Sequence, residues 1–175
     1  SHFWEIHKLE NGIWPDFHGK KVGIATLLVV RIYRRLLAYQ QINPHKENLD
    51  LEEVLSHYSP KNRDEIIGYN VPNPTDEIDP AILKARWSAI LDSIEHDLPT
   101  AEDLLDMMTR AGCVTALADA NLTPEFAMEA LHYSPFMRRR ITLLRILNML
   151  GIPDNLLTLW KTKNAVSVKR IQRFF

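Results

Sequence analysis

Apolar residues recur every three or four positions along almost the whole chain, and the strict alternation typical of half-buried strands is nearly absent. The clearest example follows Gly19, where one apolar stripe continues to about Tyr39 and indicates a long amphipathic helix. Its members are Val22, Ala25, Leu28, Val29, Ile32 and Leu36. A chain with this periodicity buries its apolar surface between helices, so we expect an all-α domain.

Capping residues and glycines divide the helical pattern into segments. Aspartate, serine or threonine precedes several apolar runs, often followed by proline, and such pairs are typical of helix starts. Besides the helix after Gly19, we expect helices at 50–57, 59–68, 79–96, 100–112, 123–133, 134–151 and 153–163. Gly112 and Gly151 are expected to end two of them. Segments 42–50 and 69–80 are expected to be loops, so the chain becomes a domain of about eight helices.

Composition narrows the class of protein. The 175 residues are enough for one domain with a substantial core, and the net charge of −1 gives no bulk attraction to nucleic acid. No apolar run reaches the roughly 20 residues needed to span a membrane. The single cysteine, Cys113, cannot form an internal disulfide, so we expect a cytoplasmic protein with a buried, inert thiol.

A histidine and a glycine, His18 and Gly19, stand directly before the long helix. Neutral imidazole is the commonest metal ligand in proteins, and His2 is a second candidate near the N-terminus. The alternative is that His18 is only the surface residue at which a helix begins, and the pattern alone favours that interpretation. Because both remain open, the histidines by themselves assign no chemistry.

Other polar residues favour structural roles. His57, His96 and His132 occur near expected helix ends, where we expect them to face solvent or to bind carbonyl groups. The run 138–140 contains three arginines that could hold a phosphate, but a solvated helix face is the more common reason for such a run. The chain contains no GxGxxG, P-loop or GxSxG motif.

Four stretches of the chain resemble a known family. The opening SHFWE and the later HGKKVGIATL resemble the metal-site region of the iron-containing alcohol dehydrogenase and glycerol dehydrogenase superfamily. LPTAEDLLDMMTRAG and ALHYSPFMRRRITLLRILNMLGI resemble two further helical segments of the same family. The branch that they resemble best is that of the sn-glycerol-1-phosphate dehydrogenases, and the matches extend from residue 1 to about residue 154.

The resemblance implies a dehydroquinate-synthase-like enzyme of two domains. An N-terminal α/β domain binds NAD(P), and a C-terminal helical domain, which residues 1–175 resemble as a single unit, carries the metal site. In this family an Asp and two His hold the metal, and His18 matches the second His. The positions of the other two ligands precede Ser1, so we expect this chain to lack them together with the nucleotide-binding domain.

His2 matches a further family histidine, one helical turn after the first metal ligand. The resemblance therefore gives His2 a catalytic role in proton transfer or substrate orientation. Two positions depart from the family pattern, because Lys20 stands where Glu or Ala is expected and Phe17 where Leu is expected. Lys20 would add a positive charge beside the site, or would point to solvent.

The implied reaction is the reversible reduction of dihydroxyacetone phosphate to sn-glycerol 1-phosphate by NADH or NADPH, with zinc, nickel or iron as the divalent metal. The 175 residues alone are expected to be inactive. Two other interpretations stay open: the same domain of a glycerol dehydrogenase, and a non-catalytic helical interaction module. The expected partners are glycerol phosphate and dihydroxyacetone phosphate, with a homodimer left open and with no nucleic acid or membrane span.

Overall fold

The computed structural model describes residues 1–152, and this part of the chain consists of helices and loops, without a strand. The α-helices are α1 (His2–Glu10), α2 (His18–Leu36), α3 (Leu51–Ser56), α4 (Pro60–Asn70), α5 (Pro80–Asp97), α6 (Ala101–Arg110), α7 (Pro124–Tyr133) and α8 (Leu143–Ile146). Four short 3₁₀ helices are η1 (Pro74–Glu77), η2 (Leu117–Ala120), η3 (Ser134–Met137) and η4 (Leu147–Met149). The predicted all-α fold is confirmed, and the predicted helix at 153–163 lies outside the described residues.

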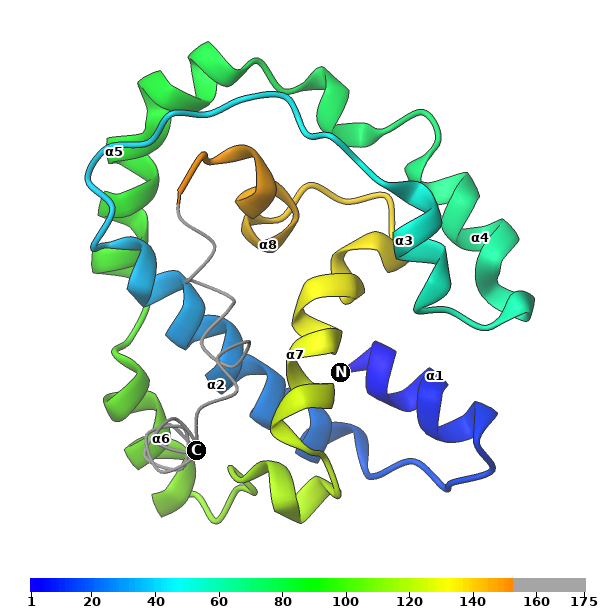
Figure 1. Cartoon of the computed structure of the whole chain (residues 1–175). Helices are drawn as coiled ribbons and strands as arrows, with labels where there is room; N and C mark the ends of the chain where they lie inside the picture. The colour runs from blue at the N-terminus through cyan, green and yellow to red at the C-terminus, as the bar shows by residue number, and fades with distance from the viewer. Residues whose placement is uncertain (153–175) are drawn as a thin grey trace, which may run out of the picture.

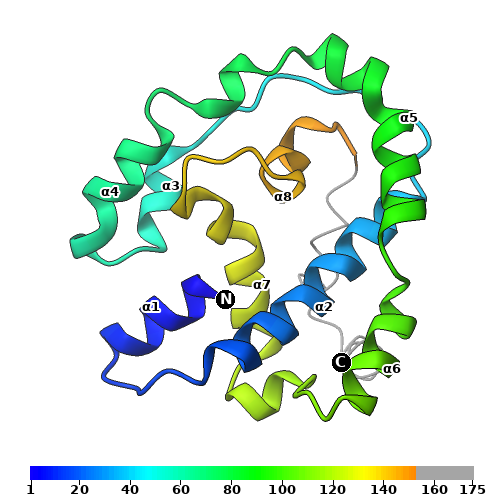
Figure 2. The ribbon, with the colours of Figure 1, turned by 180° about the vertical axis from the view of Figure 1, so that it is seen from behind.

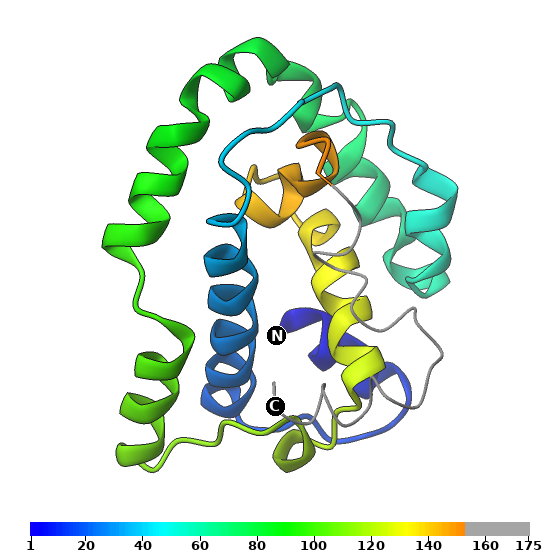
Figure 3. The same ribbon diagram turned by 60° about the vertical axis from the view of Figure 1, so that its left-hand side comes forward.

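The long helix α2 crosses the molecule, and the other helices are arranged around it (Figure 1). Helices α5 and α6 pack along one side of α2, whereas α1 packs against α7 and η3. Figure 3 shows α2 and α7 side by side in the interior, with α5 and α6 forming an outer layer. After α2 the chain runs along the outside of the molecule to α3 (Figure 2). Backbone hydrogen bonds from Asn43 and His45 to Leu150 and Met149 hold this segment against η4.

The core is formed where α2, α5, α7 and the last short helices meet. Its fully or nearly fully buried side chains include Trp4, Ile24, Leu28, Ile32, Leu36, Trp87, Leu91, Ala127, Met149 and Leu150. The predicted stripe of α2 is only partly right, because Val22 is 38% exposed and Ile24 and Leu27 are buried instead. The buried face is wider than one stripe, since α2 contacts α5, α6 and η2 at once.

Local capping follows the sequence closely. The side chains of Asp50, Asp79, Thr100 and Thr123 each accept a backbone N–H in the first turn of the helix that they precede. Gly112 and Gly151 have φ values of +71° and +61°, the left-handed conformation that ends a helix. Ser59 precedes α4 as predicted, but its hydroxyl donates to Glu10 of α1 rather than to its own helix.

The prediction of one helix over 134–151 is wrong. The segment is divided into η3, an irregular stretch, α8 and η4. Pro135 cannot donate the backbone hydrogen bond that would continue α7, and Thr142 begins a new helix by accepting the N–H of Arg145 at 3.2 Å. Ile141, which a continuous helix would bury, is 48% exposed. Helix α2 likewise ends at Leu36, before the predicted Tyr39.

No helix among residues 1–152 is both long and apolar enough to cross a membrane.

Candidate metal and substrate site

The two histidines singled out in the sequence lie together. His2 is the first residue of α1 and His18 the first residue of α2, and both side chains are exposed. Their ring centroids are 6.0 Å apart in an edge-to-face arrangement. The fold thus gathers two imidazoles at the starts of two helices on one surface.

Lysine side chains hold the loop between α1 and α2, and their contacts fix the position of the start of α2, where His18 lies. Lys8 is buried, forms an ion pair with Asp16 and donates to the carbonyl oxygen of Ala120 at 2.6 Å. Lys20 donates to the carbonyl oxygen of Asp119 at 3.1 Å, and its ammonium lies 3.9 Å from Asp16. The departure noted at Lys20 therefore has a structural role, because this residue joins the start of α2 to η2.

One helical turn inward, a second pair joins the two helices. Glu5 follows His2 by three positions and Lys21 follows His18 by three, so the carboxylate and the ammonium meet at 2.8 Å. Lys21 is 2% exposed. Its hydrogen bond lowers the pKa of Glu5, which keeps the carboxylate charged. This ion pair sets the spacing of the two helices immediately beneath the histidine rings.

The electrostatic surroundings favour a neutral His2. Partial burial lowers the pKa of His2, and the positive charge of Arg138 lowers it further. A lowered pKa means that the ring stays unprotonated to a more acidic pH, so a nitrogen lone pair is available near neutral pH. That lone pair is what a metal ligand or a proton acceptor requires.

Two imidazoles fit part of a divalent metal site. An imidazole nitrogen binds a divalent ion at about 2.0–2.1 Å, so an ion held by His18 would lie close to the His2 ring without needing it as a ligand. The described residues contain no cluster of three or more His, Cys, Asp or Glu side chains able to hold a metal. Glu5, the nearest carboxylate along α1, is engaged by Lys21. The donor set in residues 1–152 is therefore a pair of histidines.

The other candidate histidines are used structurally or face solvent. His96 is exposed and its Nδ1 lies 2.8 Å from the carbonyl oxygen of Asp92, as predicted, and His132 is also exposed. His57 differs from the prediction, because its Nδ1 lies 2.7 Å from Glu129 and its ring stacks on Tyr133.

Two further predictions were wrong in detail. Cys113 is exposed rather than buried, since the left-handed Gly112 turns the chain outward at the end of α6. The arginines at 138–140 are exposed, but they lie on irregular chain rather than on a helix face. Arg139 donates to the carbonyl oxygen of Pro72 at 3.0 Å, which ties this stretch to the loop that follows α4.

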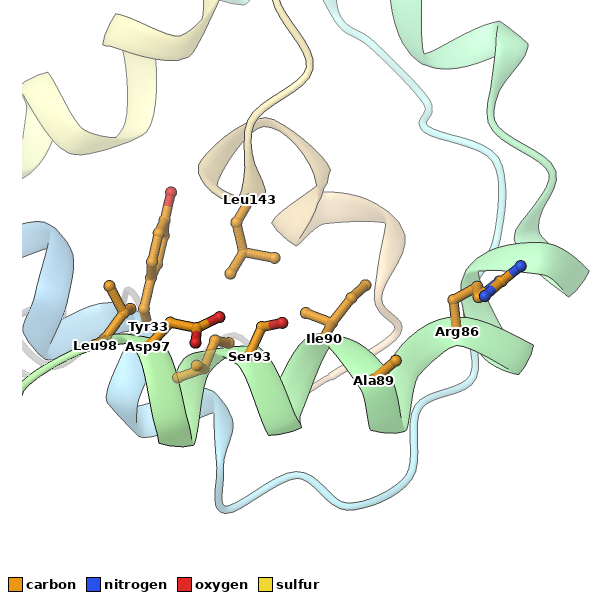
Figure 4. Close-up of a pocket in the computed structure, with 9 residues that line it drawn as sticks. Tyr33, Arg86, Ala89, Ile90, Ser93, Asp97, Leu98 and Leu143 are labelled. Atoms are coloured by element: carbon orange, nitrogen blue, oxygen red, sulfur yellow. The ribbon is translucent and has the colours of Figure 1, made fainter.

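Sequence reasoning did not anticipate an open apolar groove between α2, α5 and α8, with a volume of about 480 Å³ (Figure 4). Ile90, Leu98 and Leu143 supply apolar walls, and the rim carries Arg86 and Asp97. The groove contains none of the histidines, and its α2 residue, Tyr33, lies near the opposite end of that helix from His18.

Comparison with known proteins identifies relatives. A glycerol-1-phosphate dehydrogenase [NAD(P)+] of Bacillus licheniformis is 24% identical over 157 residues, which cover 90% of this chain and 29% of the relative. The chain resembles the glycerol-1-phosphate dehydrogenases. A second such dehydrogenase, from Geobacillus stearothermophilus, is 26% identical over 151 residues, which cover 86% of this chain and 31% of the relative.

The resemblance inferred from the sequence motifs is therefore confirmed. The chain spans about 30% of the length of the glycerol-1-phosphate dehydrogenases that it matches. No family model matches the chain, and no solved structure matches it.

Proposed function

We propose that this chain is the metal-binding helical domain of an NAD(P)-dependent sn-glycerol-1-phosphate dehydrogenase, which interconverts dihydroxyacetone phosphate and sn-glycerol 1-phosphate. The observation that carries the proposal is the 6.0 Å approach of the His2 and His18 rings. The two residues belong to separate motifs that resemble the family's metal-site region. Similarity to two glycerol-1-phosphate dehydrogenases over most of the chain supports the same assignment.

In this proposal His18 is a metal ligand and His2 a catalytic residue. A bound zinc, nickel or iron ion supplies Lewis acidity that polarises the carbonyl group of the substrate. His2 exchanges a proton with the substrate oxygen, a role for which its lowered pKa suits the neutral ring as acceptor. The Glu5–Lys21 pair holds both rings at their separation without contacting substrate.

Hydride transfer also needs a nicotinamide held against the reacting carbon. We propose that these 175 residues do not catalyse the reaction alone, since the sequence contains no glycine-rich dinucleotide motif. The remaining ligand or ligands and the NAD(P) site would come from a second domain of the kind that the family resemblance implies.

The proposal is tested with a chimera in which these residues replace the matched segment of the Bacillus licheniformis dehydrogenase. We expect NADH- or NADPH-dependent reduction of dihydroxyacetone phosphate and about one bound metal ion per chain. His18→Ala should abolish metal retention by elemental analysis, whereas His96→Ala, the matched control on α5, should retain the metal. A folded chimera that is inactive, or a His18→Ala variant with full metal content, would reject the proposal.

A further inference from the structure

The connection between α1 and α2 exposes a group of apolar side chains, here called the loop patch, which consists of Leu9, Ile13, Trp14 and Phe17. Trp14 is 89% exposed and Phe17 is 85% exposed, and the other two side chains are more than half exposed. The connection lies at the periphery of the molecule (Figures 1 and 2).

The loop patch differs from the other exposed apolar side chains of residues 1–152. Ten large apolar side chains are exposed in this part of the chain, and the six outside the loop patch are scattered over α2, α4, α5, α6 and connecting segments. Single exposed apolar residues are normal on a protein surface. Four within nine residues, including the two most exposed, are typical of an interaction surface.

Local contacts hold the loop in one conformation. Gly12 has a φ of +69°, and the N–H of Ile13 donates to the carbonyl oxygen of Lys8 at 2.8 Å, which ends α1. On the other side of Trp14, Asp16 pairs with the buried Lys8. Because the chain is anchored on both sides of Trp14, the indole stays outside. A surface that is already ordered binds a partner at a smaller cost in entropy.

The charges near the loop patch are satisfied within the chain. Asp16 is the one charged residue of segment 11–17, and its carboxylate pairs with Lys8 and lies 3.9 Å from Lys20. The carboxylate of Glu10 accepts hydrogen bonds from the start of α4. Two copies of such a surface can meet across a twofold axis without facing like charges. An anionic lipid surface instead attracts loops with a surplus of Lys or Arg, which segment 11–17 lacks.

The loop patch also has the area of a small dimer interface. One aromatic side chain buries roughly 150–250 Å², so Trp14 and Phe17 together offer roughly 300–400 Å². With the exposed parts of Leu9 and Ile13, each copy offers roughly 500 Å². Two copies would bury about 1,000 Å², which is the lower bound for a specific interface. Tryptophan and phenylalanine are also enriched in the buried centres of such interfaces.

We propose that the loop patch binds a second copy of this chain and forms a symmetric dimer. Trp14 and Phe17 of one protomer pack against the same side chains of its partner. The proposal is independent of the proposed function, because it uses neither the metal nor the substrate. Since His18 directly follows Phe17, the partner would border the candidate site.

Sedimentation velocity on the 175-residue chain tests the proposal between roughly 5 and 500 μM, the range suited to a small interface. We expect reversible dimer formation. Trp14→Ala and Phe17→Ala should each raise the dimer Kd at least about 30-fold, the effect of a central interface residue. Ile82→Ala, which removes an isolated exposed side chain of α5, should leave Kd unchanged. A chain that stays monomeric, or a dimer that Trp14→Ala does not weaken, overturns the proposal.

Nuclear magnetic resonance locates the interface. The indole N–H signal of Trp14, assigned by its loss in Trp14→Phe, should shift with protein concentration, whereas those of the buried Trp4 and Trp87 should not. A dimer without a shift at Trp14 would reject the loop patch as the interface.

Two other occupants of the loop patch give different results. A monomeric chain, together with lower activity of a Trp14→Ala chimera, would assign the loop patch to contacts with the rest of the enzyme. A monomeric chain that binds phosphatidylcholine vesicles through Trp14 would assign it to lipid. Either result rejects the dimer.

Discussion

Removing the carboxylate of Glu5 should destabilise the fold more than removing its partner Lys21. The two side chains meet at 2.8 Å, but their surroundings differ. Lys21 is 2% exposed, whereas the side chain of Glu5 is 31% exposed. In Glu5→Ala a buried ammonium loses its carboxylate, while in Lys21→Met the remaining carboxylate can still reach water.

The structure sets the size of the two effects. Breaking a fully buried ion pair by removing one partner costs about 3–5 kcal/mol, because a charge is left without compensation. Since Glu5 is partly solvated, we expect Glu5→Ala to lower the free energy of unfolding by about 2–3 kcal/mol. Methionine keeps the length and apolar character of the Lys21 stem, so Lys21→Met should cost about 0–1 kcal/mol. The double variant should be more stable than Glu5→Ala alone.

Urea unfolding followed by tryptophan fluorescence and far-ultraviolet circular dichroism measures these differences. The hydrogen bond from Lys21 lowers the pKa of Glu5 below the usual value of a glutamate side chain. The stabilisation is therefore complete above the unfolded-state pKa and is lost as the pH falls through the lower folded-state pKa. The gap between the parent chain and Glu5→Gln should accordingly shrink in acid. A cost of Lys21→Met equal to that of Glu5→Ala, or a gap independent of pH, would refute the reasoning.

Three other substitutions and one control probe other parts of the molecule. Gly151→Ala should cost more than about 2 kcal/mol in urea unfolding, because its Cβ would collide with the carbonyl oxygen of Asn43 at a positive φ. Gly68→Ala, which has open space in α4, should be neutral or stabilise by up to about 1 kcal/mol, and a loss there would contradict the argument. Thr123→Ala should lower the free energy of unfolding by about 1 kcal/mol because it removes the N-cap of α7, and an unchanged free energy of unfolding would contradict this. In the chimera, His2→Ala should retain the metal and lower kcat about 100- to 10,000-fold, and an unchanged kcat would exclude a proton-transfer role.

The helix starts could be predicted from sequence because capping is local. A side chain such as that of Thr100 binds the N–H of a residue three positions away, so its signal lies within one turn. The helix predicted over 134–151 failed because its fate depends on distant residues. Arg145 is buried there, 3.3 Å from Glu47 and over the ring of Phe136 at 4.0 Å. Helical periodicity alone places an arginine on a solvent-exposed face. No local sequence pattern indicates that the Glu47 side chain is buried where it can pair with Arg145.

The candidate site likewise has some features that the sequence predicted and others that it did not. Motif resemblance singled out His2 and His18, but nothing in the periodicity required their rings to meet, because the angle between α1 and α2 depends on the loop contacts of Lys8. Glu5 and Lys21 were missed as a pair, although each follows a candidate histidine by three positions. That repeated spacing is a usable signal, since it places the four side chains on two facing helix surfaces.

Burial separates the groups that hold the site from those that remain available to a ligand. Lys8 and Lys21 are buried, and each is compensated by a carboxylate, because an unpaired ammonium in the interior would be costly. His2 and His18 are exposed and can exchange water for a ligand without such a cost. Substitution of the first group should therefore be detected as lost stability, and substitution of the second as lost binding in a chain that still folds. The two classes of variant test the architecture and the chemistry of the site independently.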